Sequence, residues 1–307
     1  MSAISDLAGF SLDEFIVRQQ LPASFAATAT DYFLPLAQWV NRQVSTRPGP
    51  AFVLGINGAQ GAGKSTLAAF LADYLPAQYG YIVAAVSIDD LYLPKAAREA
   101  LAQTVHPLLA TRGVPGTHDP AMGQALIKQL QALGAGESLR LPRFDKLQDD
   151  LLPADQWPVV TGPVDVILFE GWCVGSQPVG ESTLAEPLND LEKTRDADGR
   201  WRKFVNTQLG GDYQALFAML DALVFMAVPE FACVCRWRTE QEHKLRAAHA
   251  KGDDRGSAPG MNDDQLAEFV QYFERITLHN LAVLPQQADV VLRLGQDHQP
   301  IAVDYRG

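Results

Sequence analysis

The chain has 307 residues, of which 47% are hydrophobic and 20% are charged, and its formal net charge is −11. This length favours one α/β domain with insertions over two independent units, and the acidic balance argues against a nucleic-acid-binding surface, which needs a basic face. Three cysteines (Cys173, Cys233 and Cys235) are too few for a disulfide framework in a chain of this length, so we interpret them as free thiols.

Residues 1–48 are predicted to form a largely helical arm that packs on the core. Phe33, Leu36, Ala37 and Val40 recur at helical spacing, and a Pro-Gly-Pro stretch at 48–50 then interrupts the chain. We therefore expect the arm to end at residue 48 and the main domain to occupy residues 49–307.

Residues 58–65 carry the complete pattern of a phosphate-binding loop, Gly-x4-Gly-Lys-Ser, between an apolar strand-like run at 51–56 and a helical run that begins at 67. Lys64 supplies positive charge for the β- and γ-phosphates, and the Ser65 hydroxyl suits Mg²⁺. An ordinary glycine-rich turn rarely carries Gly-Lys-Ser-Thr in this setting, so the sequence predicts binding of a nucleoside triphosphate with Mg²⁺. The residues expected to hold it are Gly58, Ala59, Gln60, Gly61, Ala62, Gly63, Lys64, Ser65 and Thr66.

Four further apolar runs, at 81–88, 164–169, 223–228 and 288–294, are separated by helical segments. Continuous apolar strands of this kind are typical of a parallel sheet that is covered on both faces. We predict a doubly wound three-layer α/β/α sandwich with a mostly parallel sheet, interrupted by inserts at about 90–160 and 172–220. Ligands of such folds bind at the carboxyl ends of the strands.

Two of these strand ends carry carboxylates. Asp89 and Asp90 follow the second strand, and Glu170 ends the third. We assign Asp89 as the base that accepts a hydroxyl proton, and we expect Asp89, Glu170 and Ser65 to hold Mg²⁺ directly or through water. The alternatives are a helix cap at Asp90 with a merely solvated Asp89, and a cap on the following turn at Glu170.

The loop at 112–119 is dense in turn formers and hydrogen-bond donors, and Arg112 could form a fork for a carboxylate with His118 as a partner. The alternative is an ordinary turn that ends in Asp119 as a helix cap. The segment 141–146 adds two cations and is ambiguous by itself. The candidate acceptor-binding residues are Asp90, Tyr92, Arg112, His118, Asp119, Arg143 and Lys146.

Residues 230–260 are predicted to form a lid. A charged helix begins after the fourth strand, and Arg238, Glu242 and Arg246 share one of its faces. We expect Arg238 to reach the phosphoryl group during transfer and to contribute to catalysis; a solvated helix laced by ion pairs is the alternative.

Taken together, these motifs resemble the P-loop glycerate kinases of the plant and fungal D-glycerate 3-kinase type and their bacterial kinase-like relatives. More distantly, the chain is similar to uridine kinase, phosphoribulokinase and pantothenate kinase. The wider superfamily uses an aspartate at the position that matches Asp89 as its base. The resemblance runs from about residue 52 to 284 and rests on the segments 58–66, 87–92, 112–119, 142–146, 169–172, 237–242, 260–265 and 269–270.

The resemblance implies an ATP- and Mg²⁺-dependent kinase of a small hydroxy acid, most simply D-glycerate. The plant-type enzymes have Gly-Asp-Arg after the segment that matches 142–146, whereas this chain has no arginine at 147–152. A nucleoside, a pantothenate-like molecule or a phosphosugar therefore stays open as the acceptor.

A nucleotide-dependent switch or metallochaperone GTPase is a rival from another class, but the sequence has no guanine-reading Asn/Thr-Lys-x-Asp tetrapeptide and no Cys/His metal cluster. The first residues also lack a signal peptide, and no apolar run is long enough to span a bilayer. We expect a cytoplasmic enzyme without membrane contacts, nucleic-acid contacts or an obligate protein partner.

Overall fold

The computed structural model describes residues 9–250 and 261–306, except for the side chains of 241 and 244–250. Six strands form the central sheet in the order β10-β9-β8-β1-β7-β2, and all neighbours are parallel except β10 and β9. The strands are β1 (Phe52–Gly58), β2 (Val83–Ser87), β7 (Val166–Gly171), β8 (Ala222–Ala227), β9 (Val290–Leu294) and β10 (Pro300–Tyr305). The predicted fold class and five strands are confirmed, whereas the edge strand β10 was not predicted.

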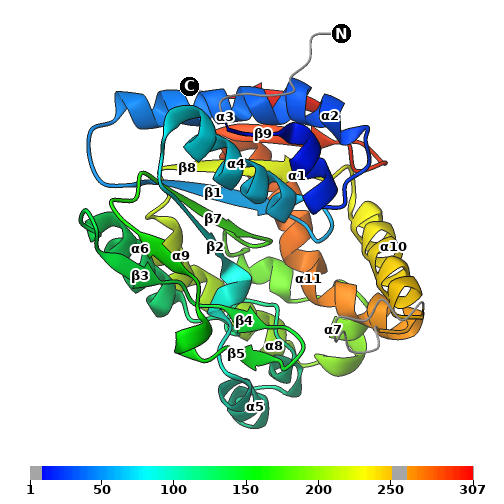
Figure 1. The fold of residues 1–307 in the computed structure, drawn as a ribbon. Coiled ribbons are helices and arrows are strands. Elements are labelled where there is room, and N and C mark those ends of the chain that lie inside the picture. The colour runs from blue at the N-terminus through cyan, green and yellow to red at the C-terminus, as the bar shows by residue number, and fades with distance from the viewer. Residues whose placement is uncertain (1–8, 251–260, 307) are drawn as a thin grey trace.

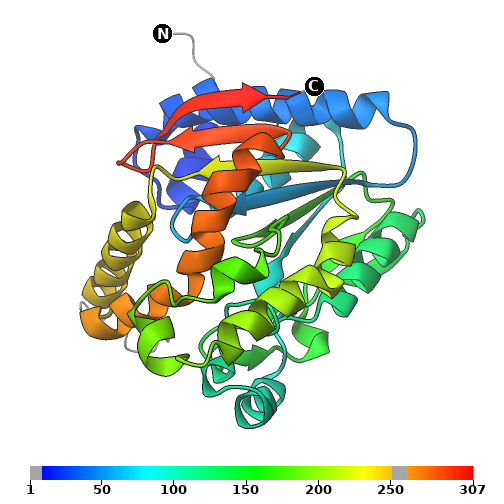
Figure 2. The same ribbon diagram turned by 180° about the vertical axis from the view of Figure 1, so that it is seen from behind.

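Helices cover both faces of the sheet, as Figures 1 and 2 show from opposite sides. Leu54 and Ile56 of β1 pack with α3 (Leu34–Thr46) and α4 (Lys64–Tyr79), whereas Val53 packs with helices of the other layer. That layer contains α6 (Pro120–Ala132), α8 (Arg200–Gly210), α9 (Asp212–Phe217) and α11 (Asp263–Val283). The alternation of side chains along β1 therefore divides the core into the two layers of a sandwich.

The N-terminal segment is helical in the part that the structure describes. It contains α1 (Leu12–Arg18), α2 (Phe25–Thr28), the π-helical turn η1 (Ala29–Phe33) and α3. Phe15 of α1 is fully buried, and its ring contacts those of Phe10, Phe25 and Phe70. Because Phe70 belongs to α4, this aromatic cluster attaches the segment to the helix that follows the phosphate-binding loop.

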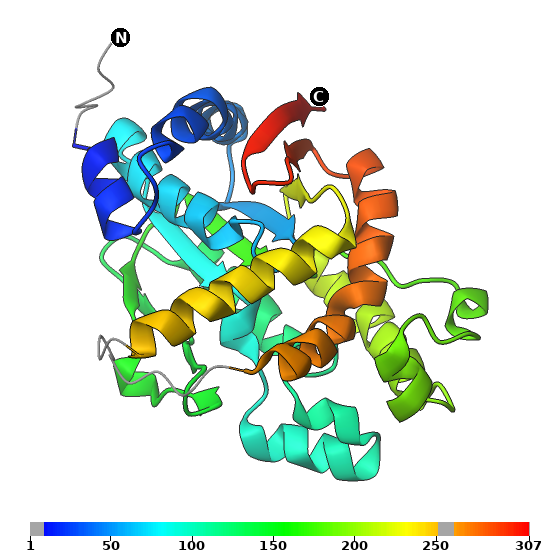
Figure 3. The same ribbon diagram turned by 90° about the vertical axis from the view of Figure 1, so that its right-hand side faces the viewer.

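The inserts add small elements outside the central sheet. The first insert holds α5 (Lys95–Thr104), α6, the ribbon of β3 (Ser138–Arg140) with β6 (Val159–Thr161), and the hairpin of β4 (Phe144–Asp145) with β5 (Asp150–Leu151). The second holds α7 (Asp190–Arg195), α8 and α9, and α10 (Phe231–Ala250) then runs across the molecule before α11 (Figure 3). Short 3-10 helices are η2 (Ile88–Leu91), η3 (Pro107–Ala110), η4 (Ala154–Gln156), η5 (Glu181–Leu184) and η6 (Leu284–Gln286). No helix in the described part of the chain combines the length and apolar character that a membrane span requires.

The strand register brings the candidate residues to one edge of the sheet. Asn57 of β1 lies beside Gly171, and Ser87 of β2 lies beside Glu170. The end of β7 lies close against the segment that follows β2. A Cβ atom on Gly171 would lie only 2.3 Å from Cγ2 of Ile88, the residue before Asp89. A side chain at position 171 would therefore displace the segment that presents Asp89.

The aromatic cluster gives a stability test of the arm. Phe15→Ala should lower the free energy of unfolding by about 3–5 kcal/mol, because it removes a fully buried ring and leaves a cavity. Urea denaturation measures this change. Val17→Ala is the matched control on the same helix, since Val17 is 77% exposed and its truncation should cost less than about 0.5 kcal/mol. Equal, small effects of both variants would contradict tight packing of the arm.

Candidate active site

The phosphate-binding loop joins β1 to α4, which begins at Lys64. Gly63 precedes this helix with a φ of 89°, a left-handed conformation that a residue with a side chain rarely adopts. The Lys64 ammonium donates to the Ala59 carbonyl at 3.0 Å. Burial lowers the pKa of Lys64, although the negative charges of Glu170 and Asp89 act in the opposite direction. The loop thus presents a half-buried cation at a helix N-terminus, the arrangement that binds phosphate.

Oxygen ligands gather next to this cation. The Ser65 hydroxyl donates to Oε1 of Glu170 at 3.1 Å, so the first turn of α4 and the end of β7 are in direct contact. Asp89 lines the same cavity. A hydroxyl and two carboxylates form the hard oxygen donor set that Mg²⁺ prefers, so these residues fit that ion.

Asp89 is held by hydrogen bonds to both carboxylate oxygens. The Tyr92 hydroxyl donates to Oδ1 at 3.0 Å, and the Lys146 ammonium donates to Oδ2 at 2.6 Å. Burial by itself would raise the pKa of Asp89, but Lys146 and the Tyr92 hydroxyl outweigh it, so the pKa lies below its ordinary value. Asp89 is therefore ionised at neutral pH, as a proton acceptor must be.

Asp90 turns away from Asp89 and lies outside the cavity. Its buried carboxylate accepts from Nη1 of Arg143 at 3.0 Å and from the backbone N–H of Phe144 at 3.1 Å. Burial raises the pKa of Asp90 even though Arg143 opposes this. The pair Asp90–Arg143, assigned from the sequence to the acceptor, instead anchors the β4–β5 hairpin to the end of β2.

His118 and Asp119 also lie outside the cavity. The His118 ring stacks on Tyr92 at 4.4 Å, and its Nδ1 lies 2.8 Å from the Tyr213 hydroxyl. Burial lowers the pKa of His118 to about 4, so the ring is neutral at pH 7. Asp119 accepts from the Met122 N–H at 2.8 Å and caps α6, which is the alternative that the sequence left open.

Arg112 lines the cavity, but its guanidinium already has partners. It forms an ion pair with Asp149 and donates to the Lys146 carbonyl at 3.2 Å. Asp149 also pairs with Arg98, whose Nη2 lies 2.9 Å from Oδ1. The sequence reading missed Arg98, because an arginine in a short amphipathic helix looks like a solvated surface residue.

The cavity that these residues line has a volume of about 970 Å³. Arg195, another residue that the sequence reading missed, faces it and pairs with Glu268 of α11. A second cavity of about 340 Å³ adjoins the phosphate-binding loop at Gly61 and is lined by Trp237, Glu240 and His298. Other residues that line the large cavity are Gln60, Lys64, Ser65, Tyr92, Trp172, Arg238, Glu242, Phe269, Tyr272 and Phe273.

The predicted lid residue Arg238 lies on α10 and faces the large cavity. Its Nη1 lies 2.9 Å from Oε2 of the buried Glu242, one turn further along the helix. The helix therefore brings a guanidinium to the cavity and also contains the ion pair that the alternative reading expects. The Arg246 side chain and residues 251–260 of the predicted lid lie outside the described residues.

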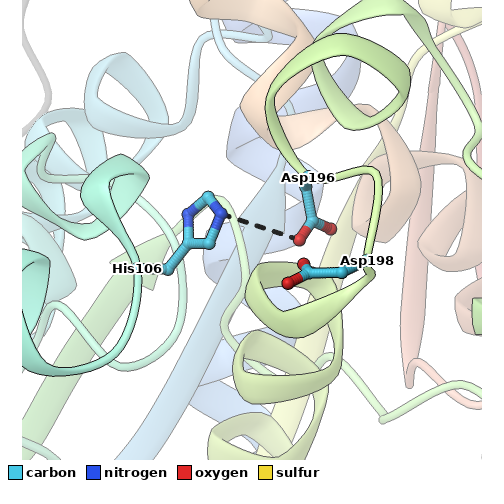
Figure 4. Close-up of side chains that lie close together, drawn as sticks. All are labelled: His106, Asp196 and Asp198. Carbon is cyan, nitrogen blue, oxygen red and sulfur yellow. Dashed lines mark ion pairs between the residues drawn. The ribbon is translucent and has the colours of Figure 1, made fainter.

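A cluster of His106, Asp196 and Asp198 lies outside the large cavity (Figure 4). Nδ1 of His106 accepts from the Leu108 N–H at 3.3 Å, so the neutral ring carries its proton on Nε2, the atom that lies 3.9 Å from Asp196. Asp196 is fully buried and already accepts from Arg202 and two backbone N–H groups. We interpret the cluster as a link between the two inserts, because its ring nitrogen has no free lone pair for a metal.

The contacts of Asp89 generate a prediction about pH. Lys146→Met should raise the pKa of Asp89 above its present value, because burial remains while the opposing positive charge is lost. Carboxyl ¹³C NMR titration of Asp89 measures the change directly. Since Asp89 must be ionised to accept a proton, the acidic limb of kcat/KM should move to higher pH as well. Lys128→Met, a lysine outside the cavity, is the control; an unchanged Asp89 titration in Lys146→Met would refute the coupling.

Comparison with known proteins places the chain among kinases. No family model matches it. It is 33% identical over 238 residues to the uncharacterized kinase mug58 of Schizosaccharomyces pombe, covering 73% of this chain and 79% of that protein. It is 28% identical over 257 residues to the chloroplastic D-glycerate 3-kinase of Arabidopsis thaliana, covering 79% of this chain but only 52% of the plant enzyme, so the match spans about half of that enzyme's length.

The fold agrees with a solved structure of the same kind. A D-glycerate 3-kinase from Cryptococcus neoformans superimposes with a TM-score of 0.71 over 90% of this chain and 99% of that one, at 24% sequence identity. These relatives are kinases, which disfavours the alternative of a GTPase switch. The chain is a small-molecule kinase and belongs to the family of P-loop kinases that includes mug58 and D-glycerate 3-kinase.

Proposed function

We propose that the protein transfers the γ-phosphoryl group of ATP, with Mg²⁺, to a hydroxyl group of a small carboxylated metabolite, most simply D-glycerate. The observation that carries this proposal is a single cavity in which Lys64 and Ser65, the ionised base Asp89 and the guanidinium of Arg112 all face the same space. These groups suit a triphosphate, a hydroxyl and a carboxylate respectively. The names of the plant and fungal relatives point to the same acceptor.

The nucleotide is assigned to the phosphate-binding loop and the second cavity. Backbone N–H groups of residues 58–66 and the Lys64 ammonium would hold the phosphates. The adenine ring of ATP would enter the cavity beside Gly61. There the rings of Trp237 and His298 stack on each other, with their centroids 4.1 Å apart. Ser65, Glu170 and Asp89 would hold Mg²⁺, directly or through water, and the ion would offset the negative charge of the phosphates.

Proton transfer is assigned to Oδ2 of Asp89. Tyr92 holds Oδ1, so Oδ2 is the oxygen left for the acceptor hydroxyl once Lys146 releases it. The released ammonium would lie beside the transferring phosphoryl group and stabilise its charge, together with Lys64 and Arg238. In the first step, the ion pair between Lys146 and Asp89 would therefore open, and both side chains would bind substrate instead.

The acceptor carboxylate is assigned to Arg112, because its guanidinium lines the cavity and a planar fork binds a carboxylate bidentately. Asp90, His118, Asp119 and Arg143 are left with supporting roles, since they lie outside the cavity. A release assay for ADP with hydroxy acids, nucleosides, pantothenate and phosphosugars tests the assignment. Turnover with D-glycerate supports it, and turnover with only a neutral nucleoside contradicts it.

Two substitutions should separate nucleotide binding from chemistry. Lys64→Ala should weaken ATP binding and turnover together, because Lys64 meets phosphate in both the ground and the transition state. Asp89→Asn keeps the shape but removes the base, so kcat should fall about 10²–10⁴-fold while affinity for ATP is largely retained. Steady-state kinetics and ATP titration provide both numbers. Asp119→Asn, at the α6 cap, is the control for Asp89→Asn, and turnover by Asp89→Asn at the wild-type rate would exclude it as the base.

Replacing the guanidinium of Arg112 should change the KM for the acceptor and leave the KM for ATP almost unchanged. Arg112→Lys should raise KM for the acceptor about tenfold or more, which corresponds to about 1.4 kcal/mol, while KM for ATP barely changes. The amide of the acceptor should be rejected by the wild-type enzyme for the same reason. Arg140→Lys is the matched control, because Arg140 lies on β3 outside the cavity. A loss of ATP affinity in Arg112→Lys would move this residue to the nucleotide site.

A further inference from the structure

Two arginines in the large cavity share a single carboxylate. Arg98 and Arg112 both pair with Oδ1 of Asp149, and both guanidinium groups lie over the Phe144 ring, at 5.9 and 5.6 Å from its centroid. The cavity pairs Lys146–Asp89 and Arg195–Glu268 each join one cation to one carboxylate. Two guanidinium groups paired with one carboxylate give the trio Arg98, Arg112 and Asp149 a formal charge of +1.

Arg98 is fixed in place. It is only 1% exposed, and its guanidinium donates to the carbonyls of Leu93, Ala110 and Asp149 at 3.1, 2.8 and 2.7 Å. A charge held this firmly in a buried position acts on its surroundings in every state of the cavity, because it cannot turn into solvent.

Asp149 belongs to the β4–β5 hairpin, and its backbone has a φ of 58°. Residues with side chains rarely adopt this conformation, although Asp and Asn tolerate it best. Its side chain is 29% exposed and lines the cavity, as does that of Arg112, also 29% exposed. Asp149 thus meets Arg98 on a buried side and leaves part of Arg112 accessible from the cavity.

We propose that Asp149 determines acceptor specificity. Together with Arg98 and Arg112 it forms an anion subsite with a formal charge of +1, so that the enzyme selects a monoanionic carboxylate over a dianionic phosphate ester. This inference rests on the proposed function, because it assigns the acceptor anion to Arg112. With Asp149 ionised, a carboxylate neutralises the remaining positive charge. A phosphate dianion brings an excess negative charge next to Asp149 in a partly desolvated site, where repulsion is weakly screened.

The charge at position 149 can be removed without changing the shape of the side chain. Asp149→Asn keeps an oxygen for Arg98 and tolerates the left-handed backbone, so the hairpin should remain in place. D-glycerate and sn-glycerol 3-phosphate are suitable probes, since both are three-carbon molecules with a free primary hydroxyl and they differ in anionic charge at pH 8. Turnover is measured by ADP release, and sn-glycerol 3-phosphate is also tested as a competitive inhibitor against D-glycerate.

We expect the wild-type enzyme to favour D-glycerate, and Asp149→Asn to shift the ratio of kcat/KM, or of affinities, at least tenfold toward sn-glycerol 3-phosphate. Asp155→Asn removes the same charge from an exposed residue outside the cavity and should leave the ratio unchanged. Asp149→Gly, which also accepts a positive φ, repeats the test if Asp149→Asn does not fold.

The outcomes are distinguishable. An unchanged ratio in folded Asp149 variants, with a wild-type enzyme that requires the acceptor carboxylate, overturns the role of Asp149 and leaves the proposed function in place. A wild-type enzyme that phosphorylates D-glycerate and glycerol equally well overturns the assignment of an anion subsite and with it the proposed function. An equal shift in Asp155→Asn would attribute the effect to net charge of the protein and so also overturn the proposal.

Discussion

The arrangement of β1 between two parallel neighbours is the constraint on which the rest of the molecule depends. Pairing with β7 and β8 fixes the height at which β1 ends, so the phosphate-binding loop emerges level with Gly171 on one side and Met226 on the other. β2 pairs with β7 and places Ser87 beside Glu170. A shift of one residue in the pairing of β1 with β7 would reverse the faces of one strand relative to the other and separate Ser65 from Glu170. The register is secured by the apolar side chains that each strand buries in both layers.

The adjacent carboxylates of Asp89 and Asp90, at the end of β2, have different surroundings. Asp89 points to the cavity, whereas Asp90 is buried and binds Arg143 and the backbone of Phe144. The hairpin that Asp90 anchors returns Lys146 to Asp89 and brings Asp149 to Arg98 and Arg112. A buried side chain outside the cavity thereby positions the partners of side chains that line it, so we interpret Asp90 as a positioning residue.

The sequence predicts the parts of the site that depend on local pattern. The phosphate-binding loop, Asp89 at the end of β2 and Glu170 at the end of β7 follow from apolar runs and the residues that end them. The pairs Arg98–Asp149 and Arg112–Asp149 join residues 51 and 37 positions apart within an insert, where no periodicity indicates which side chains meet. At Asp119 the local pattern itself is ambiguous, because a helix cap and a ligand-binding carboxylate can have the same local sequence. β10 was missed because this short edge strand opens with a proline and has no long apolar run, and Ile301 is 63% exposed.

The internal ion pairs also restrict which acceptor fits. Lys146 covers the base, and Asp149 covers much of the Arg112 fork. A ligand that displaces these contacts must offer new partners, since the partly buried carboxylate of Asp89 and guanidinium of Arg112 would otherwise lose theirs. Under the proposed assignment, a hydroxy acid would do so at both points, with its hydroxyl at Asp89 and its carboxylate at Arg112. A neutral nucleoside offers a hydroxyl but leaves the positive charge beside Asp149 without an added counterion. The phosphate dianion of a phosphosugar would bring one negative charge too many to the site beside Asp149. Under the proposed assignment of Asp89 and Arg112, the charge distribution therefore favours a carboxylated alcohol as the acceptor.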